Sequence, residues 1–237
     1  MRVLSLWSGP RNVSTAFMYS FAQRKDFEVV DEPLYGYYLS LTNIDHPGKD
    51  EILAKMNTDG ESVLKAMLKP GNKPFRLLKN MAHHWVDLDM ELLNQFTNIF
   101  LIRNPAEMLP SLVKQIPDPV LRDTGLERQY ALFEHLKSRG EPVAIVDSKQ
   151  LLLNPADILK KLCKYLGISF DEQMLSWTPG ALPEDGVWAK YWYHNVHNSS
   201  GFQPYRCKKE TFPKSLKPLL HECEPYYKLL LNHSIKL

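Results

Sequence analysis

The chain has 237 residues, of which 44% are hydrophobic and 24% charged, and its formal net charge is +2. These values suffice for one packed domain and exclude a disordered chain or a surface that coats nucleic acid. The three cysteines form no CxxC pair, so neither a disulfide framework nor a zinc site is expected. No apolar run reaches the ~20 residues that span a bilayer, and the N-terminal run is too short for a signal peptide. We therefore expect a soluble, cytoplasmic protein.

Five short apolar runs, each closed by polar turn residues, are strand candidates: 3–7, 27–30, 75–78, 99–102 and 143–146. Helical patterns follow at 14–23, 64–68, 90–96, 106–115, 121–137 and 155–165. This alternation predicts an α/β fold, a three-layer sandwich around a mostly parallel sheet of about five strands. From residue 168 the chain is rich in aromatics and proline without a clear strand. We expect one domain over 1–237, with a core at about 1–167 and a helical and loop cover at about 168–237.

Parallel sheets of this kind bind ligands at the carboxyl ends of their strands. The first such end reads Ser8-Gly9-Pro10-Arg11-Asn12-Val13-Ser14-Thr15. A turn that opens a helix offers free N–H groups to a phosphate, and here Arg11 and two hydroxyls add donors. The alternative is an ordinary helix start, with Ser14 or Asn12 as N-cap. The turn is not a Walker A loop, because no lysine precedes Ser14.

The fourth strand candidate ends in Arg103-Asn104-Pro105, and Ser111 lies eight residues after Arg103. An arginine at the strand end and a serine two turns into the next helix suit the two sides of one phosphate. The alternative is a salt-bridged arginine followed by a helix-breaking Asn-Pro pair.

Together, these two segments resemble the sulfotransferase superfamily, which uses 3′-phosphoadenosine-5′-phosphosulfate (PAPS). The first turn is similar to the family signature P-[KR]-[ST]-G-[ST]-T. Arg103 and Ser111 are similar to the second signature, an arginine at a strand end in R-[ND]-P with a serine eight residues later. The resemblance implies a P-loop NTPase-like sulfotransferase fold. It also implies that the 5′-phosphosulfate is held by the first turn, and the 3′-phosphate by Arg103 and Ser111. The residues concerned in the turn are Arg11, Asn12, Val13, Ser14 and Thr15.

Weaker similarities lie at 29–34, an EPL element, and at 143–167, with its Asn154-Pro155 and LKKLCKYLG run. Two departures stand out. Val13 replaces the usual glycine, and a β-branched residue excludes a positive φ. The family's RKG loop is absent, and segment 185–202 is the candidate replacement. Its W-x-x-x-W-Y…SxGF pattern is similar to a bacterial and plant sulfotransferase-like branch, including domains attached to aminotransferase-like chains. The candidate ligands of phosphate or adenine there are Lys190, His197, Ser199, Ser200 and Gly201, against core packing for the aromatics.

Sulfuryl transfer needs a base for the acceptor proton and a cation for the leaving phosphate oxygen. The resemblance assigns the cation to Arg11, with Lys79 as second candidate. His83 and Glu32 compete equally as the base, with His84 behind them. The chemistry requires no metal, and no metal-ligand cluster is expected.

The leading hypothesis is a PAPS-dependent enzyme that sulfates a hydroxyl or amine of a small molecule. A kinase-like nucleotide-dependent phosphotransferase and a non-catalytic nucleotide-binding module are the alternatives. Expected partners are the small-molecule acceptor and, as the one protein candidate, a second copy in a homodimer. No nucleic-acid or membrane partner is expected.

Overall fold

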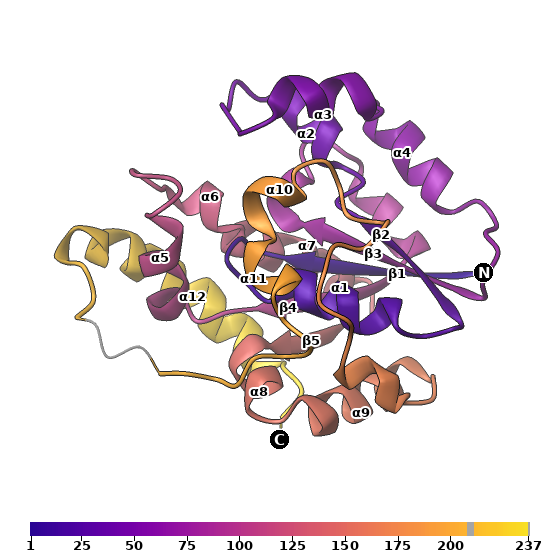
Figure 1. The fold of residues 1–237 in the computed structure, drawn as a ribbon. Helices are drawn as coiled ribbons and strands as arrows, with labels where there is room; N and C mark the ends of the chain where they lie inside the picture. Colours follow the sequence, from indigo (N-terminus) through magenta and orange to yellow (C-terminus); the bar gives the residue numbers. More distant parts are fainter. Residues whose placement is uncertain (208–210, 237) are drawn as a thin grey trace.

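The computed structural model describes residues 1–207 and 211–236 and contains a five-stranded parallel sheet at its centre (Figure 1). The strands run in the order β2-β3-β1-β4-β5, and all four pairings are parallel. Their bounds are β1 Arg2–Ser8, β2 Phe27–Asp31, β3 Phe75–Met81, β4 Thr97–Ile102 and β5 Ala144–Asp147. The predicted α/β architecture is confirmed, and each strand candidate lies at one of these strands.

Side chains that alternate along the strands build one apolar core on each face of the sheet. From β1 and β4, Leu4, Leu6 and Leu101 enter one core with helices α1, α2 and α9. Trp7 and Phe100 point the other way, into a core with α5, α7 and α12. Helices therefore cover both faces, with α1 in front of the sheet and α7 and α12 behind it in Figure 1.

The helices on the first face are α1 Ser14–Ala22, α2 Tyr35–Leu41, α3 Lys49–Lys55, α8 Ser148–Leu153, α9 Pro155–Leu166, α10 Ala189–Trp192 and α11 His194–His197. The others are α4 Gly60–Met67, α5 Pro105–Leu112, α6 Leu121–Thr124, α7 Leu126–Ser138 and α12 Lys217–Asn232. Short 3₁₀ turns are η1 Ala82–His84, η2 Met90–Gln95, η3 Glu172–Leu175 and η4 Lys214–Leu216.

The helix expected at 121–137 is two helices, because Gly125 adopts a left-handed conformation with φ of 72° between them. This break brings the end of α6 against the turn after β1. A Cβ on Gly9 would lie 2.5 Å from the carbonyl oxygen of Thr124, so only glycine fits there. Helices α2, α3 and α8 were not expected, since their sequences show no clear apolar period.

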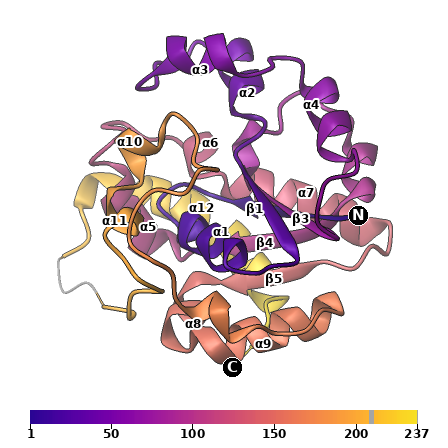
Figure 2. The same cartoon turned by 45° about the vertical axis from the view of Figure 1, so that its right-hand side comes forward.

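The segment that contains α10 and α11 crosses the α1 side of the sheet, as Figures 1 and 2 both show. An isolated antiparallel bridge between Ser176 and Gly201 joins the two sides of this segment. None of the helices in the described ranges is long and apolar enough to cross a membrane.

Candidate functional site

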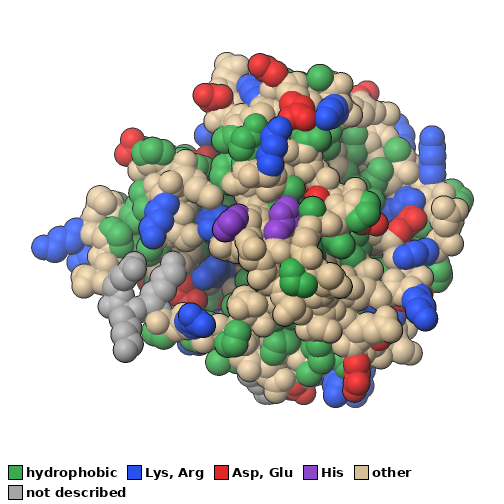
Figure 3. Space-filling view, viewed as in Figure 1, with side chains coloured by type: hydrophobic (Ala, Val, Ile, Leu, Met, Phe, Trp, Pro, Cys, Tyr) green, Lys and Arg blue, Asp and Glu red, His purple; other side chains and the backbone are tan. Residues whose placement is uncertain are grey.

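A cavity of about 740 Å³ opens at the carboxyl ends of the strands, between the first turn, α2, α5 and the α10–α11 segment. Figure 3 views the molecule from the side that carries α10 and α11, where two histidines surface near the centre. Most of the predicted site residues line this cavity: Arg11, Asn12, Val13, Ser14, Thr15, Glu32, Lys79, His83, His84, Arg103, Ser111, Ser199 and Gly201. Sequence segments up to 190 residues apart thus share one hollow.

The turn after β1 has its left-handed residue at Arg11, with φ of 52°, and not at Val13. Val13 is the N-cap of α1 with φ of −90°, which a β-branched residue adopts freely. The position therefore does not need the glycine that the family signature carries. Neither Ser14 nor Asn12 is the N-cap, and the cap makes no side-chain hydrogen bond to the first turn of α1.

Asn12 braces this turn from within. Its amide nitrogen donates to the carbonyl of Leu101 at 2.8 Å, and its side-chain oxygen accepts from the Val13 N–H at 2.9 Å. The turn is thereby fixed to the end of β4 while the α1 N-terminus faces the cavity. A helix N-terminus carries a partial positive charge and favours an anion.

Two arginines meet beside that helix end. The Arg11 Nε donates to the Ser111 hydroxyl at 2.9 Å, and an Arg103 nitrogen donates to the Arg11 carbonyl. Within residues 1–207 and 211–236, neither guanidinium forms an ion pair with a carboxylate. Burial lowers the pKa of both groups, and the nearby Arg103 charge lowers that of Arg11 further. The charges of Glu107 and Asp147 act on the pKa of Arg103 in the other direction, although neither carboxylate forms an ion pair with it. Two half-buried guanidinium groups that no described carboxylate contacts directly favour an anionic ligand. We call Arg11, Arg103, Ser111 and the start of α1 the donor end.

A second part of the site is a buried ion cluster formed by Asp31, Glu32 and Lys79, of which Glu32 and Lys79 line the cavity. The Lys79 Nζ lies 3.0 Å from Asp31 Oδ1 and 2.5 Å from Glu32 Oε1, and it also donates to the Tyr193 hydroxyl. Lys79 is only 1% exposed. Burial alone would lower the pKa of Lys79, but the two carboxylates outweigh it and raise the pKa. An ammonium has three N–H groups, and all three are used here. The candidate role of Lys79 at the leaving phosphate therefore lacks a free donor in this arrangement.

Glu32 has two unusual properties. Its backbone is left-handed with φ of 40°, a conformation that costs free energy in any residue except glycine. Its side chain is buried, and burial together with the Asp31 charge raises its pKa, although Lys79 acts in the other direction. Only three described residues other than glycine have a positive φ, and Arg11 and Glu32 are two of them. Backbone strain that is confined to such positions is typical of functional sites.

His83 and His84 come from η1, directly after β3. The His84 ring is 1% exposed and stacks on Tyr35 and Tyr38, with ring centroids 4.9 Å and 4.5 Å away. Its Nδ1 lies 4.0 Å from Glu32 Oε2 and, like the Nδ1 of His83, accepts no hydrogen bond within the described residues. Burial lowers the pKa of both histidines, so both are neutral near pH 7. His83 is half-buried and its ring faces the cavity. We call this part of the cavity the acceptor end; it consists of Glu32, Lys79, His83, His84, Tyr35, Tyr38 and Tyr193.

The predicted ligands from 185–202 divide into two groups. Ser199 and Gly201 line the cavity, but the Ser199 hydroxyl already donates to Val196 and accepts from Trp177. Lys190, His197 and Ser200 do not line it, and Lys190 pairs with Glu51 at 2.7 Å on the surface. His197 pairs with Asp185 at 2.9 Å, and the Ser200 carbonyl accepts from the backbone of Trp177. His197, Ser199 and Ser200 therefore hold the segment in place. Their hydrogen bonds pair polar groups that a loop would otherwise leave unpaired when it packs on the sheet.

Four residues that line the cavity were not singled out from the sequence: Tyr193, His46, Tyr205 and Arg206. Asp31, at the end of β2, does not line the cavity but pairs with Lys79 and accepts from Tyr193, a role that its position in the sequence did not indicate. The His46 Nδ1 lies 2.7 Å from the Tyr35 hydroxyl and forms a hydrogen bond with it. This contact crosses a loop, and no sequence pattern predicts it. For the described part of the chain, no group of three or more His, Cys, Asp or Glu side chains is arranged to hold a metal ion.

A family model described as "Sulfotransferase domain" matches residues 1–233. Two Arabidopsis thaliana proteins, named branched-chain-amino-acid aminotransferase-like proteins 2 and 1, are 42% identical over 235 and 233 residues. These alignments cover 98% of this chain and 42% of each relative, so the chain spans less than half the length of the curated relatives it matches.

Two solved structures have similar folds. The sulfotransferase domain from the curacin biosynthetic pathway has a TM-score of 0.56 at 15% identity, over 100% of this chain and 99% of that one. A sulfotransferase from Alicyclobacillus acidocaldarius has a TM-score of 0.57 at 10% identity, over 99% and 98%. At these identities, the likeness supports the fold alone.

Proposed function

Because the chain belongs to the sulfotransferase domain family, we propose that it is an enzyme that transfers a sulfuryl group from PAPS to a hydroxyl or amine of a small molecule. The donor end would hold the nucleotide, and the acceptor end would hold the molecule that receives the group.

The observation that carries this proposal is the pair of arginines after β1 and β4, neither of which forms an ion pair with a carboxylate in the part of the chain that the structure describes. Arg11 and Arg103 lie beside the N-terminus of α1, and Ser111 accepts from Arg11 between them. A nucleotide with phosphates at both the 5′ and the 3′ position supplies two anionic groups for these cations. Charge-assisted hydrogen bonds from arginine to phosphate are strong and often bidentate.

We assign the base to Glu32. A base works best when its pKa is near the working pH, and burial raises the pKa of Glu32 toward that range. The same burial lowers the pKa of His83 and His84, which weakens their hold on a proton. His83 remains the competing candidate, because its ring faces the cavity.

The proposed step moves one proton and one sulfuryl group. The acceptor O–H or N–H gives its proton to the Glu32 carboxylate as the acceptor atom bonds to sulfur. The bond from sulfur to the bridging oxygen breaks in line, and that oxygen leaves as a phosphate with an added negative charge. Arg11 lies at the donor end, where its charge would stabilise this oxygen.

The experiment that tests the proposal is thermal unfolding with two nucleotides. Adenosine 3′,5′-bisphosphate at ~100 times its dissociation constant should add roughly 2.7 kcal/mol to the free energy of unfolding and raise the Tm. ATP with Mg²⁺ should add less. A shift with ATP–Mg²⁺ and none with the bisphosphate would contradict the proposal and favour a phosphotransferase.

Turnover needs its own assay, since binding alone also fits a non-catalytic module. The protein is incubated with PAPS and a pool of small hydroxyl and amine compounds, and mass spectrometry searches for the mass gain of one sulfo group. Bisphosphate binding without any sulfated product across a broad panel would favour the non-catalytic alternative.

A further inference from the structure

Tyr193 links the C-terminal cover to the buried ion cluster. It lies between α10 and α11, it is buried, and its hydroxyl oxygen lies 2.9 Å and 2.8 Å from the two carboxylate oxygens of Asp31. The same oxygen lies 3.4 Å from Glu32 Oε1 and accepts from the Lys79 ammonium. A side chain more than 100 positions away from β2 and β3 therefore takes part in the charge balance at the ends of these two strands.

The hydrogen-bonding capacity of this hydroxyl is fully used. Trp188 Nε1 donates to it at 3.0 Å and Lys79 donates to it as well, while its own proton goes to Asp31. A phenol has one proton and two acceptor sites, so no capacity is left for a substrate. Tyr193 therefore does not act on the substrate directly.

The cluster needs such a donor because it contains two carboxylates and one ammonium. With both acids ionised, the group carries a net negative charge away from water, which is costly. The C-terminal segment supplies two donors to Asp31, the Tyr193 hydroxyl and the Gly186 N–H at 3.1 Å. These donors stabilise the Asp31 charge, so that Lys79 can be shared with Glu32.

We propose that Tyr193 is a positioning residue for the proposed reaction: through Asp31 and Lys79, its hydroxyl keeps Glu32 placed and ionised, ready to accept the proton. This inference rests on the proposed function, in which Glu32 is the base. It gives the α10–α11 segment a role in proton transfer in addition to covering the cavity.

The groups that face Glu32 from the neighbouring elements are Asp31 of β2, Lys79 of β3, His84 of η1, Tyr35 of α2 and Tyr193. Of these, Lys79 and the Tyr193 hydroxyl lower the pKa of Glu32, while burial and Asp31 raise it. Removing the hydroxyl therefore raises this pKa. A base that must be ionised then becomes active only at higher pH.

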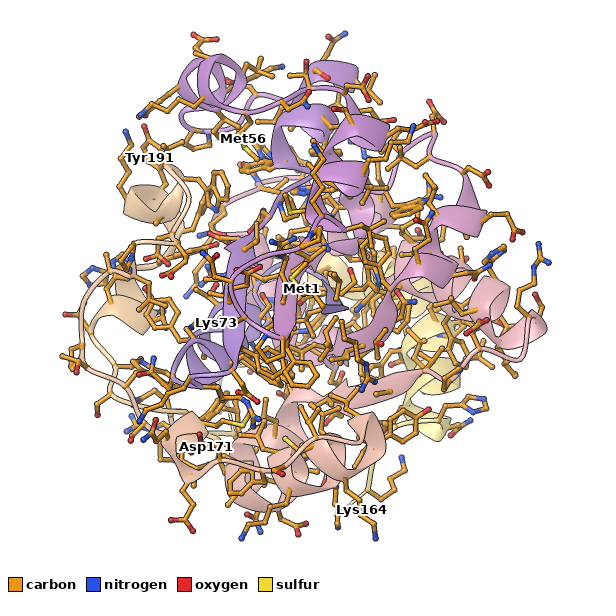
Figure 4. The ribbon with its side chains drawn as sticks, turned by 90° about the vertical axis from the view of Figure 1, so that its right-hand side faces the viewer. Met1, Met56, Lys73, Lys164, Asp171 and Tyr191 are labelled. Atoms are coloured by element: carbon orange, nitrogen blue, oxygen red, sulfur yellow. The ribbon has the colours of Figure 1, made fainter. Side chains whose placement is uncertain are left out.

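The test is the pH dependence of kcat/KM in Tyr193→Phe. We expect the acid limb to move up by roughly half to one pH unit, the shift that one lost hydrogen bond of ordinary strength produces. Tyr191→Phe is the matched control, since Tyr191 lies two residues earlier, in α10. Tyr191 is 44% exposed, and Figure 4 shows it at the outer edge of the molecule near Met56. In Tyr191→Phe, the acid limb of kcat/KM should stay at the wild-type pH.

A second control separates positioning from anchoring. The Tyr19 hydroxyl holds the same segment through Asp185, at 2.6 Å, and its other hydrogen bonds within the described residues join it to Gly180 and Leu182 and not to the ion cluster. Tyr19→Phe should lower the Tm and leave the acid limb in place. An equal shift in Tyr19→Phe, or no shift in a folded Tyr193→Phe, would overturn the proposal.

If Tyr193→Phe does not fold, Tyr193→3-fluorotyrosine decides the question, because fluorine makes the phenol a stronger donor at nearly constant size. The acid limb should then move down, and an unmoved limb would overturn the proposal. A carbon-13 NMR titration of the Glu32 carboxyl measures the same shifts without any substrate. An inactive wild type would count against the proposed function, whereas unchanged NMR titrations would count against the role of Tyr193.

Discussion

The two ends of the cavity differ in whether carboxylates contact their positively charged side chains. At the acceptor end, the Lys79 ammonium donates to two carboxylates and a phenol, so its charge is balanced within the protein. At the donor end, Arg11 and Arg103 touch a hydroxyl and a carbonyl, and no described carboxylate pairs with either. A balanced cation organises its neighbours, whereas an unbalanced one is available to a ligand.

The difference shows why residue type alone does not assign a role. Lys79 lies near the end of β3, the two arginines follow β1 and β4, and all three residues line the same cavity. Their direct partners separate them. The end of β2 supplies two carboxylates that contact Lys79, whereas the nearest acid after β4, Glu107, acts on Arg103 through its charge without forming an ion pair with it. The comparison predicts that changes at the acceptor end alter turnover, and that changes at the donor end alter nucleotide binding.

The largest expected effect is that of Glu32→Gln. Glutamine keeps the size of the side chain but cannot take the acceptor proton, so kcat should fall by about 100- to 10,000-fold. Affinity for adenosine 3′,5′-bisphosphate should stay at the wild-type value. Steady-state kinetics and calorimetric titration measure the two quantities.

Glu28→Gln is the matched control for this change. Glu28 lies four positions earlier on β2, half-buried and paired with Arg76 at 2.5 Å. Its kcat should remain close to that of the wild type. If Glu32→Gln keeps full activity while His83→Gln loses it, the base is His83 and the assignment made here is wrong.

A smaller effect is expected on stability, from the left-handed backbone of Glu32. Glycine adopts φ of 40° without the clash of a Cβ, so Glu32→Gly should be more stable than Glu32→Ala by about 1 kcal/mol. Chemical denaturation gives the free energies of unfolding. Both variants lack the carboxylate, so the difference between them reports on the backbone alone.

The order should reverse at Glu28, where β2 is extended. There, Glu28→Gly should be less stable than Glu28→Ala by roughly 0.5–1 kcal/mol, since glycine loses more chain entropy in a strand. The same order at both positions would mean that Glu32 carries no backbone strain.

The sheet could be predicted from the sequence because local signals define it. Each strand is a short apolar run that ends in polar residues, and parallel pairing leaves few ways to connect five of them. The helices were harder. Gly125 divides a segment whose apolar pattern runs on without interruption, and its left-handed conformation is required by the close approach of Gly9 to Thr124. That contact joins segments more than 100 residues apart.

The sequence identified the residues of the donor end, but only some of those that form the acceptor end. Arg11, Arg103 and Ser111 belong to short motifs at strand ends, so their order in the chain points to their meeting in space. Tyr193, the partner of Lys79 from the C-terminal cover, lies in a segment without a strand-end motif, and its ring was expected to pack in the core. His197 was expected at the ligand and instead pairs with Asp185. Burial and partner charges arise from tertiary packing, which sequence spacing does not encode.

The most direct test of the donor end compares two nucleotides on two proteins. Calorimetric titration of the wild type should show adenosine 3′,5′-bisphosphate binding about 10- to 100-fold more tightly than adenosine 5′-monophosphate, because one charge-assisted contact to the 3′-phosphate adds that much. In Arg103→Ala this preference should disappear, while Arg122→Ala, which removes an exposed arginine paired with Asp123, should keep it. Equal affinity of the wild type for both nucleotides, or an undiminished preference in Arg103→Ala, would contradict the account.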